Sequence, residues 1–230
     1  MNITPTPAAQ AIEMDQSVTG RIAAVLAERI VSGVLSPGSR LMQDHVAEEF
    51  QASHVPVREA FRKLEAQGLV ISKPRCGVRV SQLDPGMVLE VTEMRAALEG
   101  LALHYALPRL GRAELDAAHQ ALVAGEASDQ IAEWESANRR FHLAITAPCG
   151  MSRLMASIGD LQRSGARFLF ATWKKLDWQP RSDSEHRAIL DAIERGDNRS
   201  ARELLEAHVR EAGRALVERL GITATEADAA

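Results

Sequence analysis

A change of sequence period within the first 80 residues restricts the fold more than any other feature. Three segments with apolar residues at helical spacing come first, at about 19–32, 43–50 and 56–67. After Gly68 the pattern becomes β-type, with two short runs at 69–72 and 78–80 around a basic turn. A tight polar connection separates the second and third helices. Three helices, a tight turn and a hairpin are typical of a winged helix-turn-helix.

The rest of the chain predicts an all-helical bundle, so the whole protein is expected to be mostly α. Prolines and glycines interrupt the helical pattern after Pro85, and we expect six helices at about 85–107, 112–124, 128–147, 151–173, 181–195 and 197–220. The predicted organisation is a disordered tail (1–15), a winged helix-turn-helix domain (16–82), a helical effector domain (86–220) and a flexible tail (221–230).

Charge and cysteine content agree with a DNA-binding head on an acidic body. The formal net charge is -4, but residues 16–80 carry nine Lys/Arg against six Asp/Glu, whereas residues 81–230 carry 18 against 23. Cys76 and Cys149 form no metal-ligand pair and are expected to be free thiols. No apolar run approaches the roughly 20 residues of a membrane span. We therefore expect a cytoplasmic protein that does not enter membranes.

The third helix and the hairpin carry the residues expected to contact DNA. The N-terminal end of a recognition helix lies near base edges in the major groove, and a basic hairpin tip can enter the minor groove. An arginine there can pair with both acceptors of guanine, while serine and further cations contact phosphates. The candidates are Ser53, His54, Pro56, Arg58, Arg62, Lys73, Arg75 and Gly77. The alternative is a winged helix that contacts only proteins.

The helical half contains a possible metal-binding set. Asn138 and His142 are four residues apart and share a helix face, while His186 and His208 lie on two later helices. Three histidines and an oxygen donor in a bundle core have the composition of a metal site. Their spacing alone leaves open that they are structural histidines.

Arg95 is a second candidate, because it is a cation in an otherwise apolar helix. It is expected either to bind a ligand carboxylate or to form an ion pair with Glu99. Three further arginines, Arg139, Arg163 and Arg167, are weaker candidates, because charged helical residues usually face solvent.

The first half resembles the GntR family of bacterial regulators. The matching pieces are Gly33-x-Leu35-x-Pro37-Gly38-x-x-Leu41, Ala47-Glu48, Ser53-His54-Val55-Pro56-Val57-Arg58-Glu59-Ala60, Leu64-Glu65, Gly68-Leu69-Val70 and Gly77. The family usually has arginine where this chain has His54, and histidine cannot make the same two-pronged contact with guanine. The resemblance therefore implies a DNA reader whose operator differs from the common half-site.

The second half resembles FCD, the all-helical effector domain of one GntR subfamily. The matching pieces are Arg95-x-x-Leu98-Glu99, Asn138-x-x-Phe141-His142, Glu185-His186-x-x-Ile189, Ala192, Gly196-Asp197 and Ala207-His208. The resemblance implies a divalent metal, zinc or nickel, at Asn138, His142, His186 and His208, where many members have aspartate in place of Asn138. It also implies that Arg95 binds the carboxylate of an effector. Six helices are similar to the shorter, VanR-like branch.

These features together predict a transcription regulator that responds to a ligand and is not an enzyme. We expect a homodimeric repressor that binds palindromic double-stranded operator DNA and controls catabolism or transport of a small organic acid. One alternative is a metal-dependent enzyme acting on a small carboxylate, with a vestigial winged helix. Another is an architectural dimer with an empty bundle.

Overall fold

The computed structural model describes residues 17–73, 77–82, 84–172 and 181–219. Its contacts divide the chain into two compact units, and the boundary in the sequence falls between residues 83 and 84. Each unit is described by itself. The tails predicted at 1–15 and 221–230 lie outside the described residues. In the described part of the chain, every helix is too short or too polar to cross a membrane.

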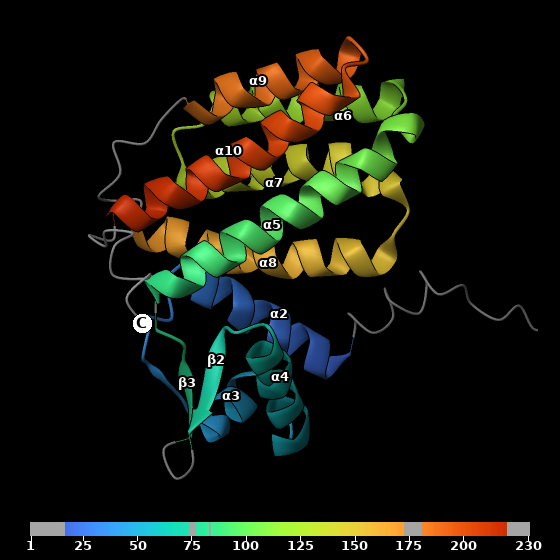
Figure 1. The fold of residues 1–230 in the computed structure, drawn as a ribbon. Coiled ribbons are helices and arrows are strands. Elements are labelled where there is room, and N and C mark those ends of the chain that lie inside the picture. Colours follow the sequence, from blue (N-terminus) through green and yellow to red (C-terminus); the bar gives the residue numbers. More distant parts are fainter. Residues whose placement is uncertain (1–16, 74–76, 83, 173–180, 220–230) are drawn as a thin grey trace, which may run out of the picture. The chain divides into compact units, whose positions relative to one another are not determined.

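The first unit contains three helices and a small antiparallel sheet (Figure 1). The elements are α2 (Val18–Val31), β1 (Arg40–Leu41), α3 (Gln43–Glu49), α4 (His54–Ala66), β2 (Val70–Lys73) and β3 (Gly77–Val80). The strand order is β1-β3-β2. The winged helix-turn-helix expected from the sequence is confirmed.

The sheet has one strand more than the predicted hairpin. Arg40 and Leu41 pair with Arg79 and Val78 on the outer edge of β3. A strand of two residues is too short to show an alternating pattern, so the sequence offers no signal for it. β1 joins the segment before α3 to the hairpin and so fixes the wing to the helical part of this unit.

The apolar face of α4 fixes this helix in the first unit. Val57, Ala60 and Leu64 are fully buried and belong to one core cluster with Ile22 and Leu26 of α2. Burial of each valine, leucine or isoleucine side chain stabilises the fold by about 1.5–3 kcal/mol. The core therefore fixes which face of α4 remains in solvent.

The second unit is a bundle of six α-helices among the described residues, which agrees with the predicted number (Figure 1). They are α5 (Pro85–Ala106), α6 (Arg112–Glu126), α7 (Ile131–Thr146), α8 (Ser152–Thr172), α9 (Arg181–Glu194) and α10 (Asn198–Arg219). Short 3₁₀ turns, η1 (Leu107–Arg109) and η2 (Ala147–Cys149), follow α5 and α7. Helix α5 packs along α10 and α8, and α6 packs against α7 and α9.

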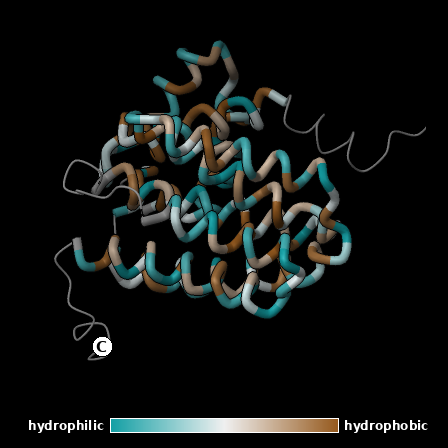
Figure 2. Tube along the Cα trace, turned by 90° about the horizontal axis from the view of Figure 1, so that it is seen from above, coloured by the Kyte–Doolittle hydropathy of each residue, from teal (hydrophilic) through white to brown (hydrophobic). Residues whose placement is uncertain are grey.

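Hydrophobic and hydrophilic residues alternate along the helices of the bundle (Figure 2). The apolar positions form a core that includes Leu103, Phe141 and Leu205, all fully buried. Several polar side chains are buried in this unit as well, namely Thr92, Glu99, His142, Thr146, Arg167, His186 and His208. Because a buried polar group costs free energy unless it is paired, this set requires an explanation beyond packing.

The close approach of Gly213 on α10 to Thr92 on α5 predicts a specific loss of stability. A Cβ at Gly213 of α10 would lie 2.2 Å from Thr92 Oγ1 of α5, whereas one at Gly159 of α8 would lie 3.6 Å from Arg163 Nη1. Both Gly→Ala changes gain similar helix propensity, so the difference in stability between the two variants reports the clash with Thr92. We expect the free energy of unfolding of Gly213→Ala, measured by urea titration, to be about 1–3 kcal/mol lower than that of Gly159→Ala. Equal stabilities would contradict this packing.

Candidate functional site

Helix α4 presents a polar face to solvent. His54, Arg58 and Arg62 are spaced four residues apart and all three are exposed. Residues at this spacing lie above one another on the helix surface. The face opposite the core is therefore a row of one histidine and two arginines.

The N-terminus of α4 leaves donors available. The helix begins at His54, two residues before the predicted start at Pro56. Proline is tolerated there because the first backbone N–H groups of a helix have no partner within it. Ser53 is the N-cap residue, but its hydroxyl makes no capping bond. The first-turn N–H groups and this hydroxyl can therefore contact a phosphate.

The three side chains of the row differ in how they are held. Arg58 has no ion pair or hydrogen bond among the described residues, whereas Arg62 Nη1 donates to Glu59 Oε1 at 2.8 Å. His54 Nδ1 lies 3.6 Å from Asp44 Oδ1 of α3. Exposed ion pairs contribute only about 0–1 kcal/mol, so Arg62 can exchange its partner for a phosphate.

The wing lies beside the row on the same side of this unit. Gly77 begins β3 with φ +76, a left-handed conformation that favours glycine. A groove is lined by Arg40, Arg58, Arg62 and Gly77. Arg40 of β1 was not predicted as a site residue, because it belongs to the strand that the sequence pattern does not reveal. Arg75 and the side chain of Lys73 lie outside the described residues.

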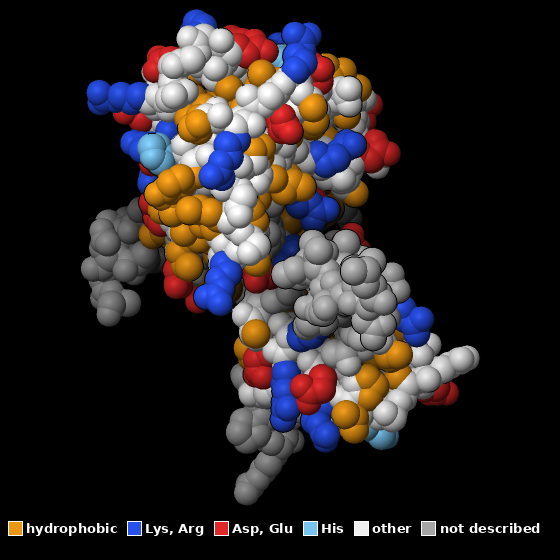
Figure 3. Space-filling model, turned by 90° about the vertical axis from the view of Figure 1, so that its right-hand side faces the viewer, with side chains coloured by type: hydrophobic (Ala, Val, Ile, Leu, Met, Phe, Trp, Pro, Cys, Tyr) orange, Lys and Arg blue, Asp and Glu red, His pale blue; other side chains and the backbone are white. Residues whose placement is uncertain are grey.

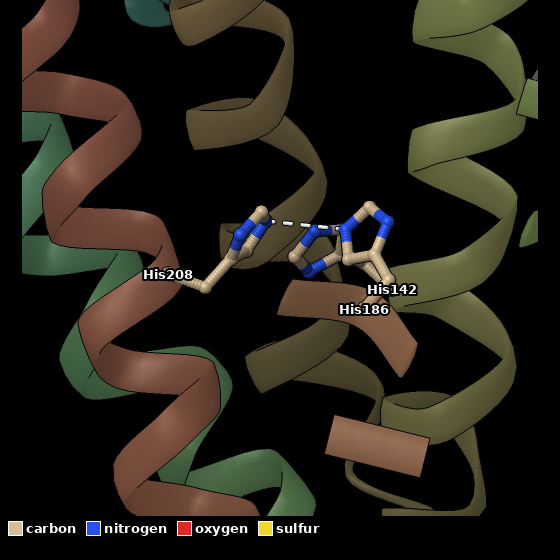
Figure 4. A group of neighbouring side chains, drawn as sticks. All are labelled: His142, His186 and His208. Carbon is tan, nitrogen blue, oxygen red and sulfur yellow. Dashed lines mark hydrogen bonds between the residues drawn. The ribbon is translucent and has the colours of Figure 1, made fainter. Parts of the chain in front are cut away.

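The bundle brings three histidines from three helices together. His142 of α7, His186 of α9 and His208 of α10 point toward one another (Figure 4). All three are buried, and one ligand nitrogen from each lies within 4.8 Å of the others. His186 Nε2 and His208 Nε2 are 3.2 Å apart. The structure thus gives the histidines the convergence that spacing alone could not establish.

Two carboxylates orient two of these rings. Glu99 Oε2 lies 2.6 Å from His142 Nδ1, and Glu185 Oε2 lies 2.7 Å from His208 Nδ1. A carboxylate accepts hydrogen bonds, so each Nδ1 is the donor. The Nε2 atoms of His142 and His208 then carry the lone pairs, which is the arrangement that metal-binding histidines usually show. The Nε2 of His142 has no hydrogen-bond partner, and that of His208 shares a hydrogen bond with His186 Nε2.

The protonation of the cluster suits cation binding. Burial lowers the pKa of His142, and burial together with the neighbouring His208 and His142 lowers the pKa of His186 well below its usual value. Burial acts to raise the pKa of Glu99, but the charge of Arg95 and the hydrogen bonds from His142 and Arg95 hold it well below its usual range. Near neutral pH His142 and His186 are therefore neutral imidazoles beside the ionised carboxylate of Glu99.

Two buried side-chain atoms among the described residues of the bundle lack the partner that a cation would supply. They are His142 Nε2 and Asn138 Oδ1, neither of which has a hydrogen-bond partner. Asn138 lies one helical turn before His142 on α7. A nitrogen lone pair and an amide oxygen are both metal ligands. The donor set of Asn138 and the three histidines therefore fits a divalent metal.

A cavity adjoins the cluster at His208. Its polar lining includes Arg95, Asn138, Gln162 and His208, and its apolar lining includes Val88, Val91, Leu169 and Leu216. Arg95 Nε donates to Glu99 Oε1 at 2.9 Å, which is the ion pair considered from the sequence. Arg95 is therefore both paired and part of the cavity wall, so the two interpretations of this residue are compatible.

The other arginines considered from the sequence differ in position. Arg139 also lines the cavity, Arg163 forms an ion pair with Asp160, and Arg167 is buried. The expectation of a solvated face is therefore wrong for Arg167, because the core encloses part of α8. Glu185 and Gln162 were not predicted as site residues, although Glu185 immediately precedes His186.

Two family models match the chain. "Bacterial regulatory proteins, gntR family" matches residues 18–80, and "FCD domain" matches residues 90–211. Together they cover both structural units, and the second alone covers more than half of the chain. The histidine cluster and most of the cavity lining lie within the FCD match, and the exposed face of α4 lies within the gntR match.

Curated relatives span most of the chain and are regulators of transcription. The "Probable D-xylose utilization operon transcriptional repressor" of Paenarthrobacter nicotinovorans is 29% identical over 84% of this chain and 86% of its own. The transcriptional repressor GlaR of Escherichia coli is 26% identical over 78% and 87%.

Solved structures of the same architecture also match. A GntR family regulator from Pseudomonas syringae is 27% identical, covers 93% of this chain and 89% of its own, and has a TM-score of 0.57. The E. coli protein McbR/YncC is 24% identical with a TM-score of 0.74, covers 89% of this chain and 99% of its own, and supports the fold. The chain thus shares both its sequence pattern and its fold with this group of regulators.

Proposed function

The chain belongs to the FCD-domain subfamily of the gntR family of bacterial regulatory proteins, and on that premise we propose that it is a repressor released by a small carboxylate. The family makes it a DNA-binding transcription regulator with a small-molecule effector in the FCD domain. Its matched relatives are regulators rather than enzymes, so we set aside the metal-dependent enzyme. The observation that carries the proposal is the cavity that Arg95 shares with Asn138 and His208.

For DNA recognition, α4 is the element that enters the major groove. Arg58 pairs with a guanine edge. Ser53 and Pro56 at the N-terminus of the helix, and Arg62 farther along it, lie against the phosphate backbone. His54 stands where the family usually has arginine, so we expect an altered base preference at that position. We propose that Lys73, Arg75 and Gly77 contact the minor groove. Because its target is chromosomal DNA, the protein acts in the cytoplasm.

For the FCD domain, we propose a divalent metal, zinc or nickel, at Asn138, His142, His186 and His208. The support is the donor set, the two orienting carboxylates and the two unpartnered atoms described above. The metal would add a positive charge next to Arg95, which favours an anionic ligand. Arg95 itself offers planar, charge-assisted hydrogen bonds to a carboxylate. The effector is therefore a small organic acid whose carboxylate lies between these two charges.

The functional form is proposed to be a homodimer on a palindromic operator, because two-fold related half-sites require two DNA-reading units. Exposed apolar side chains on α5, namely Leu89, Met94, Leu101 and Tyr105, support contact with a second copy. Hydrophobic side chains gather on one face of this unit (Figure 3). The effector shifts the equilibrium between dimer conformations only by its difference in affinity for them.

Effector-induced release of the operator tests the proposal. An operator is first selected from genomic fragments, and its complex is then titrated with acetate, lactate, gluconate, succinate and benzoate. A carboxylate that releases wild-type protein from DNA is expected to bind Arg95→Ala at least tenfold more weakly, because charged hydrogen bonds contribute about 1.5–3 kcal/mol. Calorimetry measures that affinity, and gel shifts measure operator affinity.

Arg95→Ala should keep its operator affinity and lose only its response to the acid. The matched control is Arg112→Ala, since Arg112 is largely exposed on α6 and pairs only with Asp116 among the described residues. Undiminished effector affinity in Arg95→Ala would contradict the assignment of Arg95. No response to any organic acid, with intact DNA binding, would favour the architectural dimer.

A further inference from the structure

Glu99 is a fully buried carboxylate at the centre of the bundle, between the cavity and the histidines. Its side chain has no exposed surface. An isolated carboxylate in such a place would cost several kcal/mol, so its partners must compensate for the lost hydration. Three donors from three helices do so. They are Arg95 Nε on Oε1 at 2.9 Å, Gln162 Nε2 on Oε1 at 3.2 Å and His142 Nδ1 on Oε2 at 2.6 Å.

We propose that Glu99 is a positioning residue that fixes the proton of His142 on Nδ1 and so directs the Nε2 lone pair toward the metal position. This inference rests on the metal site of the proposed function. Arg95 and Gln162 both donate to Oε1, and Oε2 is thereby left to His142. The Glu99 carboxylate also links Arg95, the proposed effector-binding residue, to His142, a proposed metal ligand.

Glu185 provides an internal comparison, because it contacts His208 in the same way. Its Oε2 lies 2.7 Å from His208 Nδ1, but its side chain is 34% exposed and has no other hydrogen bond in the described part of the chain. An exposed carboxylate can be replaced by a water molecule or can rotate, whereas Glu99 can do neither. The two glutamates therefore play similar roles under different constraints.

This difference makes the substitution by glutamine informative. In Glu99→Gln the amide oxygen must face Arg95 and Gln162, because both are donors. The NH₂ group then faces His142 Nδ1, which has to become an acceptor, and the ring proton moves to Nε2. In Glu185→Gln no second donor constrains the amide, so its oxygen can still accept from His208. The same chemical change is thus expected to reverse the tautomer of one ring and to spare that of the other.

The first measurement is zinc affinity, obtained by competition with a chromophoric chelator. Loss of an orienting partner lowers metal affinity by about 10- to 100-fold, and we expect that loss for Glu99→Gln. Glu185→Gln should lose clearly less, within about threefold. Glu99→Asp restores the charge and should recover part of the affinity. Equal zinc affinity for Glu99→Gln and wild type would overturn the proposal.

The second measurement needs no metal. Long-range ¹H–¹⁵N spectra of the metal-free protein report which nitrogen of each histidine carries the proton. We expect the Nδ1–H form for His142 in wild type and in Glu185→Gln, and the Nε2–H form in Glu99→Gln. Circular dichroism and thermal melting identify any variant that fails to fold, and Glu99→Asp then serves in its place.

The two measurements separate this inference from the proposed function. If wild type binds no zinc, the metal site fails, but the spectra still decide whether Glu99 sets the tautomer of His142. If zinc binds and the His142 tautomer is the same in wild type and Glu99→Gln, the metal site stands and the positioning role is wrong.

Discussion

Arg58→Ala is expected to weaken binding to the selected operator by about 5- to 150-fold, the equivalent of the 1–3 kcal/mol of a two-pronged contact with guanine. The reason is geometric. Arg58 is exposed on α4 between His54 and Arg62, and it is unpaired among the described residues, so no intramolecular bond must be broken when it contacts DNA. Fluorescence anisotropy with labelled operator at a fixed salt concentration measures the change.

Sequence preference distinguishes a base contact from a phosphate contact. Arg58→Ala should lose discrimination at one position of each half-site, whereas Arg62→Ala should weaken binding to all sequences alike and reduce the salt slope by about one. Arg199→Ala in the FCD unit is the matched control, because Arg199 is highly exposed and pairs with Glu203. If Arg58→Ala and Arg199→Ala bind the operator equally well, α4 is not the recognition helix.

The helices of this protein follow from its sequence because their ends are marked locally. In the bundle, all six expected segments agree with observed helices to within about three residues, since proline or glycine lies near most helix ends. Gly125 is the exception, because α6 continues through it to Glu126. The strand β1 could not be predicted from the sequence. Arg40 pairs with Arg79, which is 39 positions away, and a strand of two residues shows no periodic pattern. Local signals predict local structure, and short non-local pairing leaves none.

The candidate sites divide in the same way. The row on α4 follows from a four-residue spacing, and the histidines follow from a resemblance of motifs. The link from Glu99 to His142 spans 43 residues, and the link from Glu99 to Gln162 spans 63. Such contacts depend on how α5, α7 and α8 pack together. The sequence could suggest Glu99 only as a neighbour of Arg95 on the same helix, and Arg95 is one of its three hydrogen-bond partners.

Excess zinc is expected to raise the melting temperature of the wild-type FCD unit within the full chain, and His186→Ala should abolish most of that rise. A metal that binds only the folded state stabilises it by about 4 kcal/mol at a thousand times its dissociation constant. For a chain of this size that corresponds to about 8–16 °C. Differential scanning calorimetry with zinc and then with excess chelator measures the rise and its reversal.

The expectation follows from how the buried imidazoles are held without a metal. His186 stacks on Phe141 with ring centres 4.1 Å apart, and its Nε2 shares a hydrogen bond with His208 Nε2 at 3.2 Å, so its ring is already fixed facing the cluster. Its pKa is lowered well below the usual value by burial and by the neighbouring histidines, and protonation therefore does not compete with a metal near neutral pH. Removing His186 takes one ligand from the set and leaves the site too weak to hold zinc at micromolar concentration.

The size of the zinc-induced rise is the quantity to compare, because His186→Ala also changes the stability of the metal-free protein. His119→Ala is the matched control, since His119 is exposed on α6 and contacts Glu194 outside the cluster. It should keep the full rise. A rise of equal size in His186→Ala and His119→Ala would mean that zinc binds elsewhere on the chain. Buried histidines with lowered pKa values would then be a cost to the fold without a metal to offset it, and the cluster would need another ligand.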